Sequence, residues 1–140
     1  MTASTVPPAD LVARQTAFVE TVQDAGRLDR IEEFVDPAFV DHCAPPGLPR
    51  GPEGVRAVLG AIRAALPDHD ARVVHMIASG DLVATHKTFT GTHRGDFFGL
   101  PPSGRVVTIR VMDFVRYHDG RIVEHWNTVD ASDLAGAARA

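Results

Sequence analysis

Two short turn sequences divide the second half of the chain into long β-strands. Gly80-Asp81 and Asp119-Gly120 each lie between runs rich in β-branched and aromatic residues, a pattern typical of β-hairpins. Helical patterns occur only before these runs and after the last one. The sequence therefore predicts an α+β fold in which N-terminal helices pack on an antiparallel sheet. The predicted strands cover residues 71–79, 82–92, 105–118 and 121–130.

The first half of the chain predicts three helices, and the end of the chain predicts a short fourth one. Apolar side chains recur at helical spacing in the first helix, and Gly26 is its stop signal. The third begins at Pro52, and Pro67 ends it. A flexible lead-in is expected over residues 1–9 and a single domain over residues 10–140. The other helices are predicted over residues 10–25, 28–35 and 131–140.

Composition excludes several classes of protein. The chain has 140 residues, of which 44% are hydrophobic and 23% charged, which suits one globular domain. Its net charge of −4 offers no basic stripe for nucleic acid. No apolar run is long enough to span a bilayer, and Met1–Asp10 lacks the features of a signal peptide. Cys43 is the single cysteine and is expected to be a small packing residue. We expect a cytoplasmic protein without membrane contact.

Strand 105–118 alternates, and its apolar face includes one acid. Val111, Asp113 and Val115 share that face, which we expect to form the wall of a pocket. The register of the next strand decides which residue lies opposite Asp113. A two-residue turn would place Trp126 there, whereas a three-residue turn with Gly120 left-handed would place His125 there. The alternation of valines favours the second register, which also brings Asn127 to the pocket face.

An aspartate beside a histidine in a pocket is a candidate acid/base pair. A carboxylate bonded to one imidazole nitrogen fixes the tautomer, and the other nitrogen can then remove or return a proton. Asp113 and His125 are therefore the predicted catalytic residues. The alternative is a buried structural pair that ties two strands together.

The remaining histidines are weaker candidates. A tight turn at Gly80-Asp81 places His75 across from His86, and His86 is expected to face the pocket. His42 is expected to reach inward beside Asp41; the alternative is a turn-capping aspartate and a surface histidine. We expect His93 in an exposed turn, and His69 and His118 at the surface. No metal or other cofactor is expected, because no spacing predicts three converging ligands.

Several motifs occur together in order along residues 10–135. They are Asp41-His42 with Pro45-Pro46-Gly47 and Gly51-Pro52-Glu53-Gly54-Val55, then Gly91-Thr92-His93-Arg94-Gly95, Gly99-Leu100-Pro101-Pro102-Ser103-Gly104-Arg105, Asp113-Phe114-Val115-Arg116 and Asp119-Gly120-Arg121-Ile122-Val123-Glu124-His125-Trp126. Together these motifs resemble the SnoaL-like polyketide cyclase (ester cyclase) family.

This resemblance implies a nuclear-transport-factor-2-like fold, a cone whose strongly curved antiparallel sheet encloses a pocket. It also implies that the family's acid/base aspartate aligns with Asn127 and its partner histidine with Asp113. Asparagine cannot exchange a proton at neutral pH, so Asp113 and His125 would have to supply the proton chemistry.

The expected function is a cofactor-independent acid/base enzyme. It would act on a hydrophobic oxygenated small molecule, remove a proton next to a carbonyl and close a ring by an intramolecular aldol or ester-type step. Asn127 and His42 would orient the carbonyl. The other predicted substrate contacts are His86, Asp41, Val111 and Val115. Two alternatives stay open: an epoxide-opening enzyme of the same fold, and a small-molecule binding protein.

The face opposite the pocket predicts a contact with a second copy. It includes Met112, Phe114 and Trp126, and large apolar side chains on an outward sheet face are typical of an interface. The resemblance also implies dimers built through the sheet. We therefore expect a homodimer; the alternative is that the terminal helix covers this face.

Overall fold

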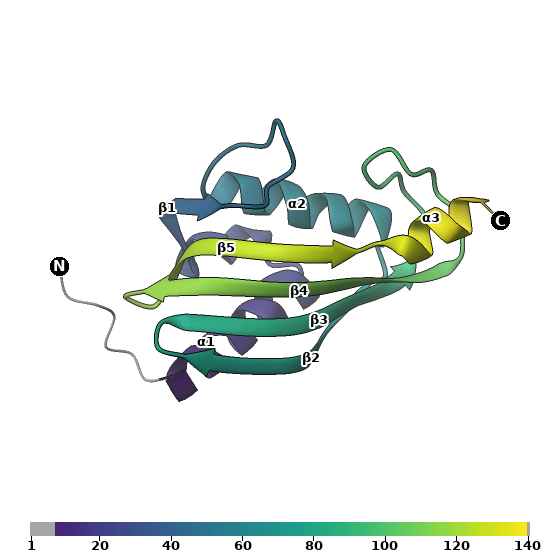
Figure 1. Cartoon of the computed structure of the whole chain (residues 1–140). Coiled ribbons are helices and arrows are strands. Elements are labelled where there is room, and N and C mark those ends of the chain that lie inside the picture. Colours follow the sequence, from purple (N-terminus) through teal and green to yellow (C-terminus); the bar gives the residue numbers. More distant parts are fainter. Residues whose placement is uncertain (1–7, 140) are drawn as a thin grey trace.

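Five strands form one curved, open sheet, and helices α1 and α2 lie on one face of it (Figure 1). The structure is a computed structural model that describes residues 8–139. It confirms the predicted α+β architecture. The predicted lead-in falls mostly outside the described residues, as does Ala140. The elements are α1 (Pro8–Phe18), η1 (Val19–Asp24), η2 (Leu28–Glu33), β1 (Val35–Asp41), α2 (Pro52–Ala65), β2 (Asp70–Ser79), β3 (Leu82–Thr92), β4 (Val106–His118), β5 (Arg121–Asp130) and α3 (Ser132–Arg139).

The sheet has one strand that the sequence pattern did not predict. Its order is β1-β5-β4-β3-β2, and β1 pairs in parallel with β5, so the sheet is mixed rather than wholly antiparallel. Of the helix predicted over residues 28–35, only Leu28–Glu33 is helical, as a 3₁₀ helix, and the chain is extended from Val35. Pro37 lies within β1. A proline is tolerated there because β1 is an edge strand.

The first hairpin has the predicted register, but the predicted face of His86 is wrong. Ser79 pairs with Leu82, and His75 pairs with His86. The buried set on β3 is the alternating one that contains Lys87 and Phe89. His86 therefore lies on the outer face. The polar, small side chains around it suit solvent, whereas the neighbouring valine and phenylalanine fill the core.

The second hairpin keeps the predicted face of His125 but not its predicted partner. Asp119 and Gly120 form a two-residue turn with φ of 48° and 78°, and His118 pairs with Arg121. One extra residue, Val123, then interrupts the ladder between Tyr117–Ile122 and Arg116–Glu124. Asp113 pairs with Asn127 instead of His125.

Both the expected three-residue turn and the observed bulge change the register by an odd number of residues. The side chain of His125 therefore lies on the same side in either case. The structure confirms that Asp113, His125 and Asn127 share the inner face of the sheet, where all three line one cavity.

The first helix changes type where it approaches the core. Regular α-helix ends at Phe18, and a π-helical segment continues to Asp24. Leu11, Phe18 and Val22 are buried on one stripe, as predicted, and Gln15 is fully buried on the same stripe. Gly26 ends the helical segment at φ 76°, a conformation that glycine adopts without steric cost.

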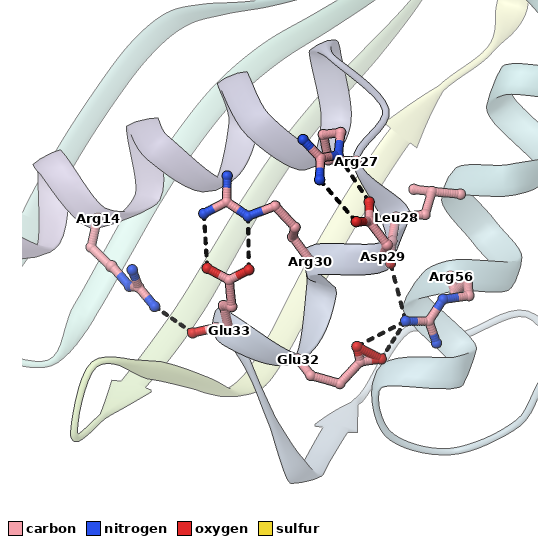
Figure 2. A network of polar contacts seen from close by, with 8 residues as sticks. All are labelled: Arg14, Arg27, Leu28, Asp29, Arg30, Glu32, Glu33 and Arg56. Atoms are coloured by element: carbon pink, nitrogen blue, oxygen red, sulfur yellow. Dashed lines mark hydrogen bonds and ion pairs between the residues drawn. The ribbon is translucent and has the colours of Figure 1, made fainter.

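A polar network at the surface joins the helical layer (Figure 2). Arg56 of α2 binds Glu32 of η2 and donates to the carbonyl oxygen of Leu28 at 3.0 Å. Arg30 and Glu33 form a bidentate pair at 2.7 and 2.8 Å, and Arg14 of α1 donates to the carbonyl of Glu33. Exposed ion pairs stabilise little, about 0–1 kcal/mol each. These contacts link α1 to η2 and η2 to α2.

Helix α3 covers β4 only near its first residues, around Thr108. Leu134 is fully buried, and the Asp133 carboxylate accepts a hydrogen bond from the backbone N–H of Thr108 at 3.1 Å. Met112 and Phe114, farther along β4, remain 57% and 53% exposed. The alternative in which this helix covers the outer face does not hold for these two side chains.

Candidate functional site

A cavity of about 280 Å³ lies between the inner face of the sheet and the helical layer. Its volume is close to the lower end of the range of small-molecule sites. The lining is mainly apolar, and Val111 and Val115 belong to it as predicted. The other sides of the cavity include Phe18 of α1, Leu59 of α2 and Phe89 of β3. An apolar cavity with few polar groups suits a hydrophobic ligand that those groups orient.

The polar part of the cavity is centred on Asp113. Its Oδ2 atom lies 2.9 Å from Nζ of Lys87, and the two side chains are only 1% and 5% exposed. β3 and β4 position this buried ion pair, because both residues occupy inward positions of adjacent strands. The Oδ1 atom of Asp113 has no hydrogen-bond partner among residues 8–139. A buried carboxylate with one free oxygen is a candidate for contact with a ligand.

His125 lies between two carboxylates. Its Nδ1 atom is 3.1 Å from Oδ1 of Asp41, and its Nε2 atom is 3.5 Å from Oδ2 of Asp113. The parallel pairing of β1 with β5 brings Asp41 directly beside His125. Lys87, Asp113, His125 and Asp41 thus form a chain of alternating charge, named the charge chain below.

The carboxylates and the imidazole favour one another's charged forms. Burial alone would raise the pKa of Asp113, but the charge of Lys87 and the contact with His125 outweigh it and lower the pKa. Burial likewise opposes ionisation of Asp41, and its hydrogen bond with His125 lowers the pKa nonetheless. Burial would lower the pKa of His125, but Asp113 and Asp41 raise it. The site therefore favours an imidazolium between two carboxylates.

This geometry corrects one feature of the predicted mechanism. The sequence predicted that Asp113 holds one nitrogen of His125 and leaves the other free to act as a base. Asp41 occupies that other nitrogen, so neither nitrogen is free. The 3.5 Å contact with Asp113 is the looser of the two, so the N–H at Nε2 is the one that a ligand oxygen can engage.

Two predicted pocket residues lie outside the cavity. His42 stacks on Trp126 with ring centroids 4.8 Å apart, and its Nε2 lies 2.9 Å from Oε2 of Glu124. It is on the outer side because neighbouring residues of an extended chain point to opposite faces, and His42 directly follows Asp41, whose side chain points inward to His125. His86 faces outward beside His75, with 3.2 Å between their Nδ1 atoms. Neither histidine can orient a ligand in this cavity.

Three further side chains differ from expectation in burial. His93 is fully buried rather than exposed, because it packs under the loop after β3, where its Nδ1 lies 3.4 Å from Oγ of Ser103. His69 is buried too, with its ring nitrogens facing the carbonyls of Gln23 and Leu66 at 2.7 and 3.1 Å. Cys43 is exposed and lines the cavity, where loop residues leave it uncovered.

Sequence reasoning missed three polar cavity residues, Gln15, Gln23 and Lys87. Lys87 occupies an inward position between Thr85 and Phe89, and that alternation was the available signal. Gln15 follows Leu11 by one helical turn on the buried stripe of α1. A polar residue on an apolar stripe is a recognisable signal for a buried partner or ligand.

Residues 8–139 contain no cluster of three or more histidine, cysteine, aspartate or glutamate side chains suited to holding a metal ion. Among the helices described here, none has the length and apolar character needed to cross a bilayer.

The comparisons with known proteins agree with the fold and with the motifs. A nogalonic acid methyl ester cyclase from Streptomyces nogalater is 27% identical over 119 residues, which cover 83% of this chain and 86% of that protein. The structure of IdmH from Streptomyces antibioticus is 34% identical, with a TM-score of 0.75, and the match covers 96% of this chain and 100% of that one. TsrD from Streptomyces laurentii shares the fold at 22% identity, with a TM-score of 0.84 and coverage of 95% and 97%. The SnoaL-like polyketide cyclase family model matches residues 13–137, and the chain belongs to that family.

Proposed function

We propose that the protein is a cofactor-independent acid/base enzyme that closes a ring in a hydrophobic, oxygenated polyketide-like molecule. The observation that carries this proposal is the charge chain at the wall of an apolar cavity. The family and the cyclase named above support the class of substrate. An intramolecular aldol closure moves one proton from carbon to oxygen and leaves the composition unchanged, so the chemistry asks for no redox partner.

Asp113 is the proposed base. Its free Oδ1 atom takes a proton from a carbon next to a carbonyl, and the electron pair of that C–H bond forms an enolate. The lowered pKa keeps this carboxylate ionised before the substrate binds. Lys87 balances its charge, so that an anionic base is tolerated inside an apolar cavity. A bound substrate excludes water, which leaves the carboxylate fewer competing partners.

His125 is the proposed acid. The enolate carbon attacks a second carbonyl of the same molecule, a C–C bond forms, and the π pair of that carbonyl becomes an alkoxide. The imidazolium donates its Nε2 proton to the alkoxide. The proton that Asp113 took from carbon then passes to His125, which restores the carboxylate and the imidazolium. Asp41 holds Nδ1 and favours the imidazolium throughout.

Asn127 is the proposed donor for the carbonyl oxygen. It pairs with Asp113 across the strands and lines the cavity. A side-chain amide can donate to an oxygen that gains negative charge in the enolate, which stabilises that charge without exchanging a proton.

The direct test uses nogalonic acid methyl ester as the first candidate substrate, because a 27% identical relative is named for it. We expect conversion to an isomer of equal mass with a new retention time in liquid chromatography. Asp113→Asn should lower turnover on the order of 10²–10⁴-fold. Asp119→Asn is the matched control, since Asp119 is an exposed turn residue whose φ of 48° asparagine also tolerates.

Equal turnover by wild type and Asp113→Asn would contradict the proposed role of Asp113. Tight binding without any conversion, across a panel of polyketide esters and ketones, would favour the binding-protein alternative. An epoxide-opening activity has less support. Such a site would need an arginine in the pocket with the aspartate and the asparagine, and Arg110, the candidate for that role, is exposed on the outer face.

We also propose that two copies associate through the outer face of the sheet. Ile77, Met112 and Phe114 share this face and are 71%, 57% and 53% exposed. A second copy is the favoured occupant because the exposed apolar side chains continue across β2 and β4 on the outer face of the sheet. Light scattering at micromolar concentration should give twice the mass of the 15.0 kDa chain. A monomer mass would contradict this proposal.

A further inference from the structure

The helical side of the cavity contains an amide whose orientation is fixed at one end. Gln15 of α1 is fully buried, and the hydroxyl of Tyr117 donates to its Oε1 atom at 2.6 Å. Burial raises the pKa of the Tyr117 hydroxyl, so this group stays protonated and remains a donor at working pH. With Oε1 occupied as the acceptor, Nε2 is the atom that Gln15 presents to its surroundings.

The Nε2 atom of Gln15 has no hydrogen-bond partner among residues 8–139, although it is buried. Buried donors in native proteins are nearly always paired, so an unpaired one calls for an explanation. Gln15 lines the cavity, and a ligand there is the available partner. Gln23, two helical turns later, lines the same cavity and has an unpaired, buried Oε1 atom.

The residue that orients Gln15 lies farther along β4 than the proposed base. Tyr117 and Asp113 occupy the same face of β4 four residues apart, which corresponds to about 13 Å between their Cα atoms. Val115, which lies between them on that face, lines the cavity, so an apolar side chain separates the proposed base from the residue that orients Gln15. A ligand that reaches both must carry polar groups at two separated places with an apolar body between them.

We infer that Gln15 is a specificity-determining residue. Its Nε2 donates a hydrogen bond to an acceptor oxygen on the part of the substrate remote from the reacting carbon. The substrate class is thus a fused-ring or ring-forming ketone with a second, distal oxygen. The identity of the reacting end rests on the proposed function, whereas the distal contact rests on Gln15 and Tyr117 alone.

The test compares two ligands of nearly equal shape. In 6-methoxy-1-tetralone an ether oxygen lies at the far end of the ring system from the ketone, and in 6-ethyl-1-tetralone a methylene replaces that oxygen. Calorimetric titration should show that the wild-type protein prefers the methoxy compound by roughly tenfold, the effect of one buried hydrogen bond. Gln15→Leu should reverse this order, because the site then has an apolar group where the donor was.

Tyr117→Phe is the second variant and keeps the shape of the core. Without the hydroxyl, the amide of Gln15 is free to turn, and the preference for the methoxy compound should weaken towards parity. A purely structural role for Gln15 would lower both affinities equally and leave their ratio unchanged. The same ratio in wild type, Gln15→Leu and Tyr117→Phe overturns the inference.

Deuterium exchange at C2 of the tetralone, followed by NMR in D₂O, separates this inference from the proposed function. Asp113→Asn should lose the exchange and keep the methoxy preference. A wild-type protein that prefers the methoxy compound but exchanges no C2 proton would contradict the proposed chemistry while supporting the distal subsite.

Discussion

Replacing Lys87 by methionine removes the positive charge that faces Asp113 and keeps the length and most of the apolar volume of the side chain. In the wild type the two charged atoms are 2.9 Å apart and almost fully buried. A pair at this distance attracts by about 6 kcal/mol at an effective dielectric constant of 20. Desolvation offsets much of that energy, so the pair as a whole contributes far less.

Removing only one of the two charges costs more stability than removing both. Lys87→Met leaves the Asp113 carboxylate buried without its main counter-charge, and such losses cost about 3–5 kcal/mol. Burial, the largest influence on Asp113, is then opposed mainly by His125, so the pKa of Asp113 should rise above its unfolded value. The sign of the pH effect follows. The wild-type contribution of Asp113 is present above its unfolded pKa and is lost as pH falls through the folded pKa. In Lys87→Met the stability should instead increase as pH falls, because protonation removes the unpaired charge.

Urea unfolding at pH 7 and pH 5 measures both effects. Lys87→Met with Asp113→Asn is the matched control, since it removes both charges and should recover most of the loss at pH 7. An unfolding free energy of Lys87→Met within 1 kcal/mol of wild type at pH 7 would refute a buried, uncompensated carboxylate. A loss that the double variant does not recover would place the effect in packing rather than in charge.

Two further predictions concern activity, and one concerns stability. Turnover should rise with pH as Asp113 ionises through its lowered pKa and should fall as His125 loses its proton through its raised pKa; a profile that falls only on the acid side would contradict the role of His125 as the acid. Asn127→Asp removes the proposed amide donor and places a carboxylate opposite Asp113, so it should lower ring-closing turnover on a ketone substrate, as measured by product formation; an increase would contradict the proposed role of Asn127. The raised pKa of His125 adds stability below about pH 6.5 that is lost as pH rises through the folded pKa; His125→Gln should therefore flatten the pH dependence of urea unfolding between pH 6 and 9.

The inner face of β4 was predictable because its alternation is regular and includes a single acid, Asp113. The shared face of His125 and Asn127 followed as well, since the parity of the register was right even though the turn was assigned wrongly. The position of the bulge was not predictable: nothing in Val123 distinguishes it from its neighbours as the residue that leaves the ladder.

The other site residues depend on contacts between distant segments. Lys87 is tolerated inside only because Asp113 lies beside it on the next strand, and β3 alone offered two faces of similar polarity. Asp41 reaches His125 through a strand with an internal proline and no regular alternation of burial. Gln15 interrupts an apolar stripe of α1, and its hydrogen-bond partner, Tyr117, comes from a strand that is distant in the sequence.

The parallel pairing of β1 with β5 also affects the order in which the molecule can assemble. Asp41 and His125 are 84 residues apart in sequence, so their contact closes one of the longest loops in the chain. Hairpins such as β2–β3 and β4–β5 close over a few residues and form fast, whereas distant pairings wait for chain entropy to be overcome. We expect β1 to dock late, after the four antiparallel strands have formed. Until β1 docks, the edge of β5 that pairs with it is therefore unprotected, and on a ribosome this edge is absent until β5 has emerged. The step that covers the edge also brings Asp41 to His125 and so completes the charge chain.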